Sequence, residues 1–173
     1  MKIPLAVSVV CLALSFYPIL AAETVRLDMR NKSEAREHAV TFVAQAGELG
    51  HAFVIWNKED DSKKMTTNEA LGFYPGAEKD KLEAKWGFGD GQIANDSGEK
   101  GDYHLVVTVN TDQFDSSRAV LEAWQKKGNY LLLFSDCTTF TGEVARSLGL
   151  KTPTRAFAPY PIEYVRGIYS ESK

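Results

Sequence analysis

The sequence predicts a single α+β domain in which an antiparallel sheet packs against segregated helices. Apolar segments with strand-like patterns recur between residues 24 and 110 and are separated by turn residues. Apolar residues with helical spacing are concentrated in 111–127 and 137–150, so strands and helices do not alternate regularly along the chain. In a chain of 173 residues, this order of elements is typical of one α+β domain and not of a doubly wound parallel sheet.

The predicted strands are apolar runs that end at glycine or proline. Gly47 and Gly50 separate two of these runs, and Pro75 and Gly76 end the next one. Segments 50–57 and 67–74 are interpreted as a hairpin that is joined by a charged loop. The predicted strands are 24–29, 38–44, 50–57, 67–74, 103–110 and 129–134, and the last of them (NYLLLF) is expected to be buried.

Capping residues delimit the two main helices. Thr111 or Asp112 is the expected cap of the first, and Gly128 its stop. Gly149 closes the second, which carries the sequence SDCTTFTGEVARSLGL. The predicted helices are 77–86, 111–127 and 135–150.

Two segments are expected to be irregular. Residues 87–102 contain several glycines without apolar periodicity, which indicates a surface loop. Residues 151–169 are rich in proline and aromatic residues and are predicted to lie extended on the surface.

The net charge of −3 argues against nucleic acid as a partner, because phosphate binding requires an excess of basic residues.

Residues 1–22 have the layout of a secretory signal peptide. Lys2 precedes an apolar run, and Ala21 and Ala22 follow it as a small-residue cleavage site. Cleavage leaves residues 23–173 as one periplasmic or secreted domain without a stable membrane span. The alternative is an uncleaved anchor, because residues 3–22 are almost long enough to cross a bilayer.

Cys137 is the candidate nucleophile. The only other cysteine, Cys11, lies in the signal segment, so the exported domain keeps one unpaired thiol. Ser135 or Asp136 is expected to cap the helix that begins at Cys137. Free backbone N–H groups and the helix dipole would then stabilise a thiolate and the oxyanion that forms when it attacks a carbonyl. The alternative is a buried structural cysteine.

A nucleophilic cysteine needs a general base, and the chain offers three histidines. His51 opens a strand directly after Gly50, so it can approach another element closely. His38 is interpreted as facing solvent, and His104 as a half-buried structural residue. Taken alone, the pattern favours His51 only slightly.

The order of two motifs suggests a family. GHAFV at 50–54 precedes DCTTF at 136–140, and this arrangement resembles the circularly permuted papain-like hydrolases, which are relatives of NlpC-type cell-wall peptidases and include lecithin:retinol acyltransferase-like enzymes. The resemblance covers residues 38–150. It implies a permuted papain-like fold with a Cys137–His51 pair and no metal or other cofactor. Asp136 departs from the family pattern, in which asparagine is commoner.

The family also implies a third polar residue that orients the imidazole. Glu69 is the candidate, because it shares a face with His51 if the hairpin is centred near residue 62. Asn57, Asn68 and His104 are alternatives.

These observations predict an exported cysteine hydrolase that cleaves an amide bond through a thioester. Its expected substrate is cell-wall peptide. One alternative is a lipid esterase or acyltransferase with the same Cys–His pair, in which Phe157, Tyr160, Tyr164 and Tyr169 line an apolar groove. The other is a non-catalytic binding module. The sequence does not separate amide from ester chemistry.

Overall fold

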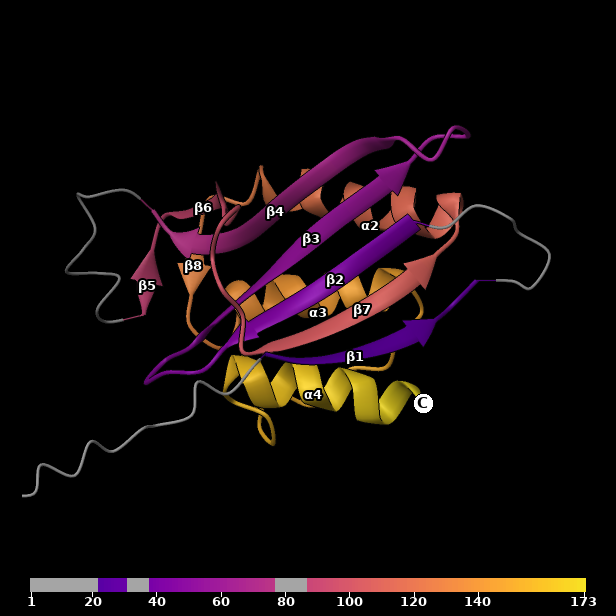
Figure 1. Ribbon diagram of the computed structural model, residues 1–173. Coiled ribbons are helices and arrows are strands. Elements are labelled where there is room, and N and C mark those ends of the chain that lie inside the picture. The colour runs from indigo at the N-terminus through magenta and orange to yellow at the C-terminus, as the bar shows by residue number, and fades with distance from the viewer. Residues whose placement is uncertain (1–21, 31–37, 77–86) are drawn as a thin grey trace, which may run out of the picture.

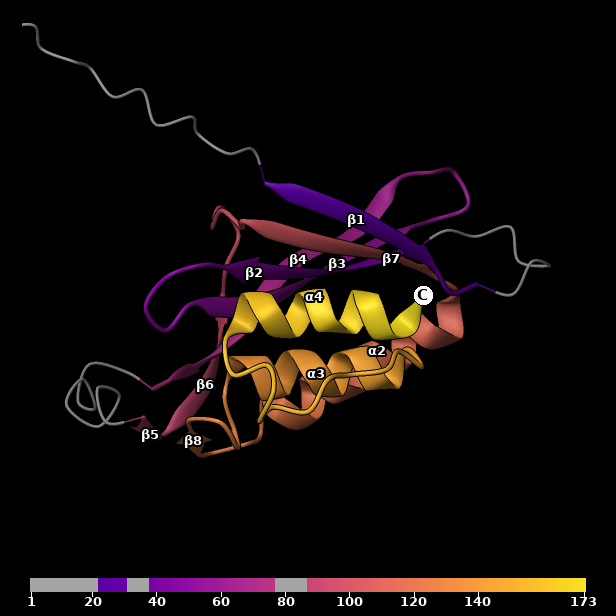
Figure 2. The same ribbon diagram turned by 90° about the horizontal axis from the view of Figure 1, so that it is seen from below.

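The computed structural model describes residues 22–30, 38–76 and 87–173. Figure 1 shows a large sheet with helices behind it, and Figure 2 shows that the helices form a layer on one face. The α+β class is therefore confirmed. The strands are β1 (Glu23–Asp28), β2 (His38–Gln45), β3 (His51–Glu59), β4 (Met65–Pro75), β5 (Phe88–Gly89), β6 (Gly91–Asn95), β7 (Tyr103–Val109) and β8 (Tyr130–Leu131). The helices are α2 (Thr111–Trp124), α3 (Cys137–Ser147) and α4 (Pro161–Ser172).

Among the described residues, the main sheet has the strand order β1-β7-β2-β3-β4-β6, and β5 pairs with β8. The core lies between this sheet and the helices. Trp56 of β3 donates a hydrogen bond from Nε1 to Oγ of Ser117 in α2, and its ring contacts that of Phe140 in α3. Phe53 points to the opposite face, where it packs with Val43 and Ala70. The alternation along β3 thus fills both faces of the sheet.

The predicted hairpin is confirmed as β3 and β4. Phe53 pairs with Gly72, which centres the hairpin between residues 62 and 63. The predicted strands at 38–44 and 103–110 are also confirmed, as β2 and β7.

The predicted strand at 24–29 is present as β1, but the prediction of a wholly antiparallel sheet is wrong at this edge. β1 pairs with β7 in parallel, and Glu23 lies opposite Tyr103. Apolar alternation specifies which face of a strand is buried, but it does not specify the direction of the neighbouring strand.

The interpretation of 87–102 as a loop is wrong, because this segment contains β5 and β6. Gly91 shows why the glycines of this segment were wrongly interpreted as loop residues. A Cβ atom at this position would collide with the ring of Phe73. The glycine therefore permits close packing within a strand and does not mark a loop.

The prediction of a buried strand at 129–134 is also wrong. Only Tyr130–Leu131 is a strand, and the chain turns at Leu133, whose φ is +70°. The side chains of residues 131–134 are exposed. An apolar run of this length is normally buried, and nothing in the local pattern distinguishes the exposed case.

The segment after α3 is not extended throughout, as predicted, because α4 begins at Pro161. Proline has no N–H to lose at the first helical position, so it starts this helix instead of breaking one. Tyr164, Val165 and Ile168 then bury one face of α4.

The helix ends partly follow the sequence. Asn110, and not Thr111 or Asp112, caps α2 in a capping box with Gln113. Gly149 follows α3 with a positive φ of 82°, as expected for a helix stop.

The predicted helix at 77–86 lies outside the described residues. None of the helices within the described ranges has the length and apolar character that crossing a membrane requires.

Three chain segments meet at one end of the sheet. β3 begins there with His51, β6 runs beside the end of β4, and α3 begins below them. The chain then crosses from β6 to β7 over the face opposite the helices (Figure 1). Lys100 accepts a hydrogen bond from the Gln45 side chain on this path. This crossing buries residues that would otherwise lie on an open sheet face.

Candidate active site

Cys137 is the first residue of α3, and Asp136 is its N-cap. Oδ1 of Asp136 accepts a hydrogen bond from the backbone N–H of Thr139, while Oδ2 accepts one from Leu133 N–H and one from Arg155. Of the two expected caps, Ser135 and Asp136, the structure has Asp136 as the cap. The negative charge at residue 136 is therefore paired with a guanidinium and is directed away from the sulfur.

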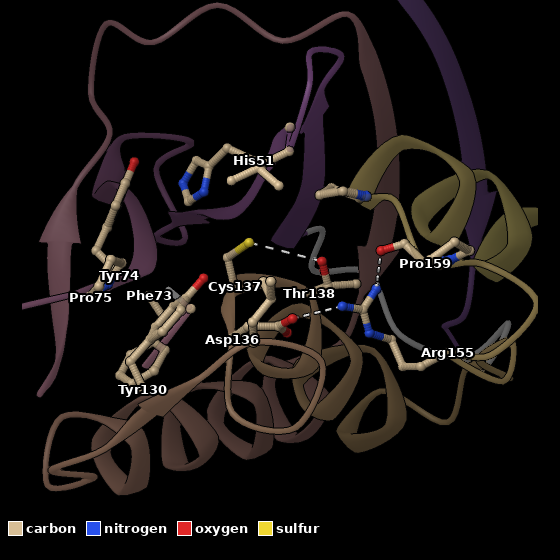
Figure 3. A pocket seen from close by; sticks show the side chains of 15 residues that line it. His51, Phe73, Tyr74, Pro75, Tyr130, Asp136, Cys137, Thr138, Arg155 and Pro159 are labelled. Atoms are coloured by element: carbon tan, nitrogen blue, oxygen red, sulfur yellow. Dashed lines mark hydrogen bonds and ion pairs between the residues drawn. The ribbon is translucent and has the colours of Figure 1, made fainter. Parts of the chain in front are cut away.

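The sulfur of Cys137 points toward the imidazole of His51 (Figure 3). The cysteine is 8% exposed, and its Sγ lies 3.9 Å from Oγ1 of Thr138. Its backbone N–H belongs to the first turn of α3, where N–H groups have no partner within the helix. The site thus combines a nucleophilic atom with a donor for an oxyanion.

His51 is placed by the tight turn before β3. Gly50 has a φ of +64°, and a Cβ atom there would lie 2.7 Å from the carbonyl oxygen of Gln45. Only glycine fits this turn without strain. The imidazole then packs on the ring of Tyr74, with 4.3 Å between ring centroids.

Asp96 lies behind His51 and completes a row of three groups. Oδ2 of Asp96 is 3.6 Å from Nε2 of His51, which is an ion-pair distance, and Asp96 is 2% exposed. The hydroxyl of Tyr74 donates a hydrogen bond to Oδ1 of the same carboxylate. Burial, followed by this hydrogen bond, raises the pKa of Tyr74 and keeps its hydroxyl protonated as a donor.

Opposing effects act on the protonation of His51. Burial lowers its pKa, but the interactions with Asp96 and Cys137 outweigh burial and raise the pKa to about 9. At neutral pH the ring is therefore expected to carry a proton. A proton on this ring lies between the sulfur and the carboxylate, where it is available for transfer to a leaving group.

Gly72 makes room for the pair. A Cβ atom at this position would lie 2.7 Å from Nε2 of His51 and would also collide with Oδ2 of Asp96. β4 therefore has a glycine at the point where the two side chains meet.

The Cys137 sulfur and the His51 ring line a cavity of about 380 Å³. Tyr130 lies beside Cys137 at its base, and burial followed by the negative charge near Cys137 raises the pKa of this tyrosine (Figure 3). The remaining lining is largely apolar and includes Leu49 and Leu132. A carbonyl compound with an apolar flank fits this composition.

The structure brings together the two principal residues of the sequence prediction, Cys137 and His51, but it does not bring Glu69 to them. Glu69 pairs with Trp56 across the hairpin, and its carboxylate accepts a hydrogen bond of 2.7 Å from Arg118 of α2. Because the hairpin is centred between residues 62 and 63, and not at 62, Glu69 points to the face opposite that of His51.

The alternatives to Glu69 lie elsewhere too. Asn57 and Asn68 pair with each other six residues beyond His51, which is about 20 Å along the strand. His104 is half-buried on β7, as predicted, with Nε2 3.4 Å from the carbonyl oxygen of Gly101. The interpretation of His38 as solvent-facing is wrong, because it is buried, with Nε2 3.2 Å from Oγ1 of Thr111.

Sequence reasoning missed Asp96, Tyr74 and Arg155. Asp96 follows a strand that was taken for a loop, and its burial depends on the chain crossing from β6 to β7. The one local signal is Gly72, since a glycine inside a strand often marks the close approach of another group.

Comparison with known proteins adds no family. No protein-family model matches the sequence, and no curated protein or solved structure is significantly similar to it. Membership of the permuted papain-like hydrolases therefore stays a prediction.

Proposed function

We propose that this chain is an exported cysteine hydrolase that cleaves an amide bond through a thioester, with cell-wall peptide as its substrate class. In this proposal Cys137 is the nucleophile, His51 is the general base and acid, and Asp96 is the positioning residue. The observation that carries it is that Cys137 and His51 line one cavity, while the buried Asp96 carboxylate lies 3.6 Å from the imidazole.

The first half of the reaction forms the thioester. The proton of the Cys137 thiol passes to His51 as the thiolate–imidazolium pair forms, and the thiolate sulfur attacks the carbonyl carbon. The backbone N–H of Cys137 stabilises the resulting oxyanion. The carbon–nitrogen bond then breaks, and the leaving amine takes the proton from His51.

The second half releases the acyl product. His51 takes a proton from water, and the hydroxide attacks the thioester carbonyl carbon. When the carbon–sulfur bond breaks, the proton returns to the sulfur and a carboxylic acid leaves. Asp96, held by Tyr74, fixes the ring orientation during both transfers.

The order of elements fits a permuted papain-like arrangement, which we propose as the detailed fold. The strand that begins with the histidine precedes the helix that begins with the cysteine, and the acidic residue comes between them in sequence. The motif that suggested the family and the site geometry are thus consistent with each other.

A second candidate function is hydrolysis or transfer of a lipid acyl group. The exposed apolar side chains beside the cavity favour it, since Leu49 and Leu132 both line the cavity and are exposed. The catalytic groups and the thioester would be the same, and the acceptor would be water or an alcohol.

Thiol alkylation tests whether the site is catalytic at all. Cys137 is expected to react with iodoacetamide at pH 6 about tenfold or more faster than a free thiol, because the imidazolium stabilises the thiolate. Mass spectrometry of the peptide that contains Cys137 distinguishes this reaction from alkylation of Cys11. His51→Gln should remove the acceleration. Equal rates for Cys137 and the free thiol would support a non-catalytic binding module.

Product analysis then distinguishes the two substrates. Purified peptidoglycan and phospholipid vesicles are incubated separately with the protein and with Cys137→Ala, and the released products are identified by mass spectrometry. New amino and carboxyl ends from peptidoglycan support the amidase. Release of fatty acid from vesicles supports the lipid candidate instead.

A further inference from the structure

Large apolar side chains are exposed to solvent at the end of the molecule that carries the cavity, and two of them, Leu49 and Leu132, line it. They come from four separate segments: the turn between β2 and β3, the strand β5, the turn after β8, and the segment before α4. In Figures 1 and 2 these four segments lie at the same end of the molecule. We call this set the apolar rim; it consists of Leu49, Phe88, residues 131–134, Phe157 and Tyr160.

The phenylalanine side chains of the rim are largely exposed. Phe134 is 73% exposed and Phe157 is 88% exposed, so most of each ring is in water. Soluble proteins seldom gather so many exposed large apolar side chains in one place without an interaction that covers them.

Hydrogen bonds hold the turn after β8 in this exposed conformation. The N–H of Leu132 donates to the carbonyl oxygen of Gly87, and the N–H of Phe134 donates to that of Leu131. Leu133 has a φ of +70°, which is unfavourable for leucine, and its N–H donates to Oδ2 of Asp136. The fold therefore fixes the backbone while it presents leucine and phenylalanine to solvent.

The segment before α4 is held in the same way. The N–H of Phe157 donates to the carbonyl oxygen of Thr154, and the guanidinium of Arg155 donates to those of Ala158 and Pro159. Arg155 also pairs with Asp136, so it joins the two exposed segments at their base.

The strand β1 begins at this same end of the sheet. Glu23 of β1 pairs with Tyr103, Tyr103 pairs with Ala44, and Ala44 pairs with Ala52, which follows His51. The first residue of β1 thus lies at the end of the sheet that carries the rim. Residues 3–22, which precede it in the sequence, carry no charged side chain.

We propose that the apolar rim docks on a lipid bilayer, with its leucine and aromatic side chains inserted among the headgroups and upper acyl chains. Two observations favour a bilayer over a protein partner. Exposed side chains from separate segments can enter a soft interface without a complementary surface, and in the uncleaved chain the adjoining sequence 3–22 has the length and composition of a segment that contacts membranes. The cavity mouth would then face the bilayer. This proposal does not depend on catalysis.

Vesicle binding tests the proposal in the full chain, with the same N-terminus in every variant so that its contribution cancels. The double substitution Phe134→Ser and Phe157→Ser should weaken partitioning into phosphatidylcholine vesicles by about tenfold or more. Met65→Ser is the matched control, because Met65 is 46% exposed at the far end of the β3–β4 hairpin. It should bind like the unmodified chain. Added salt should change little, since insertion is apolar.

Depth-dependent quenching identifies which residues enter the bilayer. In Phe134→Trp, brominated phosphatidylcholine should quench the added tryptophan fluorescence, whereas in Met65→Trp the added fluorescence should persist. Equal quenching of the two, or equal partitioning of the double variant and the unmodified chain, would overturn the proposal. A lipid-free dimer that the double substitution dissociates, together with no quenching at residue 134, would also overturn it in favour of a second copy of the chain.

Discussion

Nε2 of His51 and Oδ2 of Asp96 lie 3.6 Å apart, and both atoms are buried without a hydrogen-bond partner among the described residues. The second oxygen of Asp96 is bound by Tyr74, so one end of the carboxylate is fixed while the other faces the imidazole. Burial of two unpaired polar atoms is unfavourable unless they interact with each other. The His51–Asp96 pair therefore either takes part in catalysis or destabilises the fold, and several experiments distinguish these two roles.

Asp96→Asn should lower the pKa of His51 from about 9 by at least about one unit, because the nearby negative charge is removed. Proton NMR of the His51 ring across pH 5 to 10 measures this change directly. Glu69→Gln is the matched control, since Glu69 bonds to Arg118 on the other face of the sheet. A normal titration of His51 in Glu69→Gln and an altered one in Asp96→Asn are expected. The reverse pattern would restore Glu69 as the positioning residue.

Gly72→Ala should disrupt the same pair without removing either group. The added Cβ would lie 2.7 Å from Nε2 of His51, so the imidazole or the carboxylate must move. We expect slower alkylation of Cys137 and a loss of about 1–3 kcal/mol in the free energy of unfolding, as for other overpacked sites.

Gly128→Ala serves as the control for this substitution. A Cβ atom there meets nothing within 4 Å, so the unfolding free energy should change by no more than about 0.5 kcal/mol. Urea denaturation of both variants measures the two changes. If Gly72→Ala alkylates at the unmodified rate, the spacing of His51 and Asp96 has no role in thiol reactivity.

The sequence was most informative where local rules determine the structure. Strand alternation predicted β2, β3, β4 and β7, and a capping residue before an amphipathic segment predicted the position of Cys137 at the start of α3. The meeting of Cys137 with His51 came from the order of two short motifs and not from periodicity. Local patterns alone favoured His51 only slightly over His38 and His104.

The third group required information that no local pattern contains. Asp96 is buried because the chain crosses the sheet between β6 and β7, which is a property of the topology. Glu69 was chosen on the assumption that the hairpin is centred at residue 62, whereas the true centre lies half a residue further on. This difference shifts the pairing by one residue, which places every side chain of the second strand on the other face of the sheet. The exposure of residues 131–134 could not be predicted from the sequence either, because an apolar run has the same pattern whether it is buried or exposed.

The raised pKa of His51 predicts a stability that depends on pH. The folded-state pKa is about 9 and the unfolded value is 6.5, so protonation of the folded state contributes about 3 kcal/mol at pH values below 6.5. This contribution declines above pH 6.5 and is lost as the pH rises through 9. The unfolding free energy, measured by urea denaturation at pH 6 and pH 10, should therefore fall with pH. In His51→Gln this part of the decline should be absent, and parallel curves for the two proteins would contradict the assignment.

The charge of Asp136 predicts a specific coupling with Arg155. Asp136 is 1% exposed, caps α3 and accepts a hydrogen bond of 2.6 Å from the guanidinium, so an asparagine here would keep the cap but leave Arg155 without its counter-charge. Asp136→Asn should therefore destabilise the fold by about 3 kcal/mol, the usual result of breaking a buried pair from one side. Arg155→Gln added to this variant should cost less than the sum of the single changes. Urea denaturation of the four proteins gives the coupling energy. A value near zero would mean that the aspartate serves only the helix cap and the N–H of Leu133, and that the guanidinium holds the segment before α4 only through the carbonyl oxygens of Ala158 and Pro159.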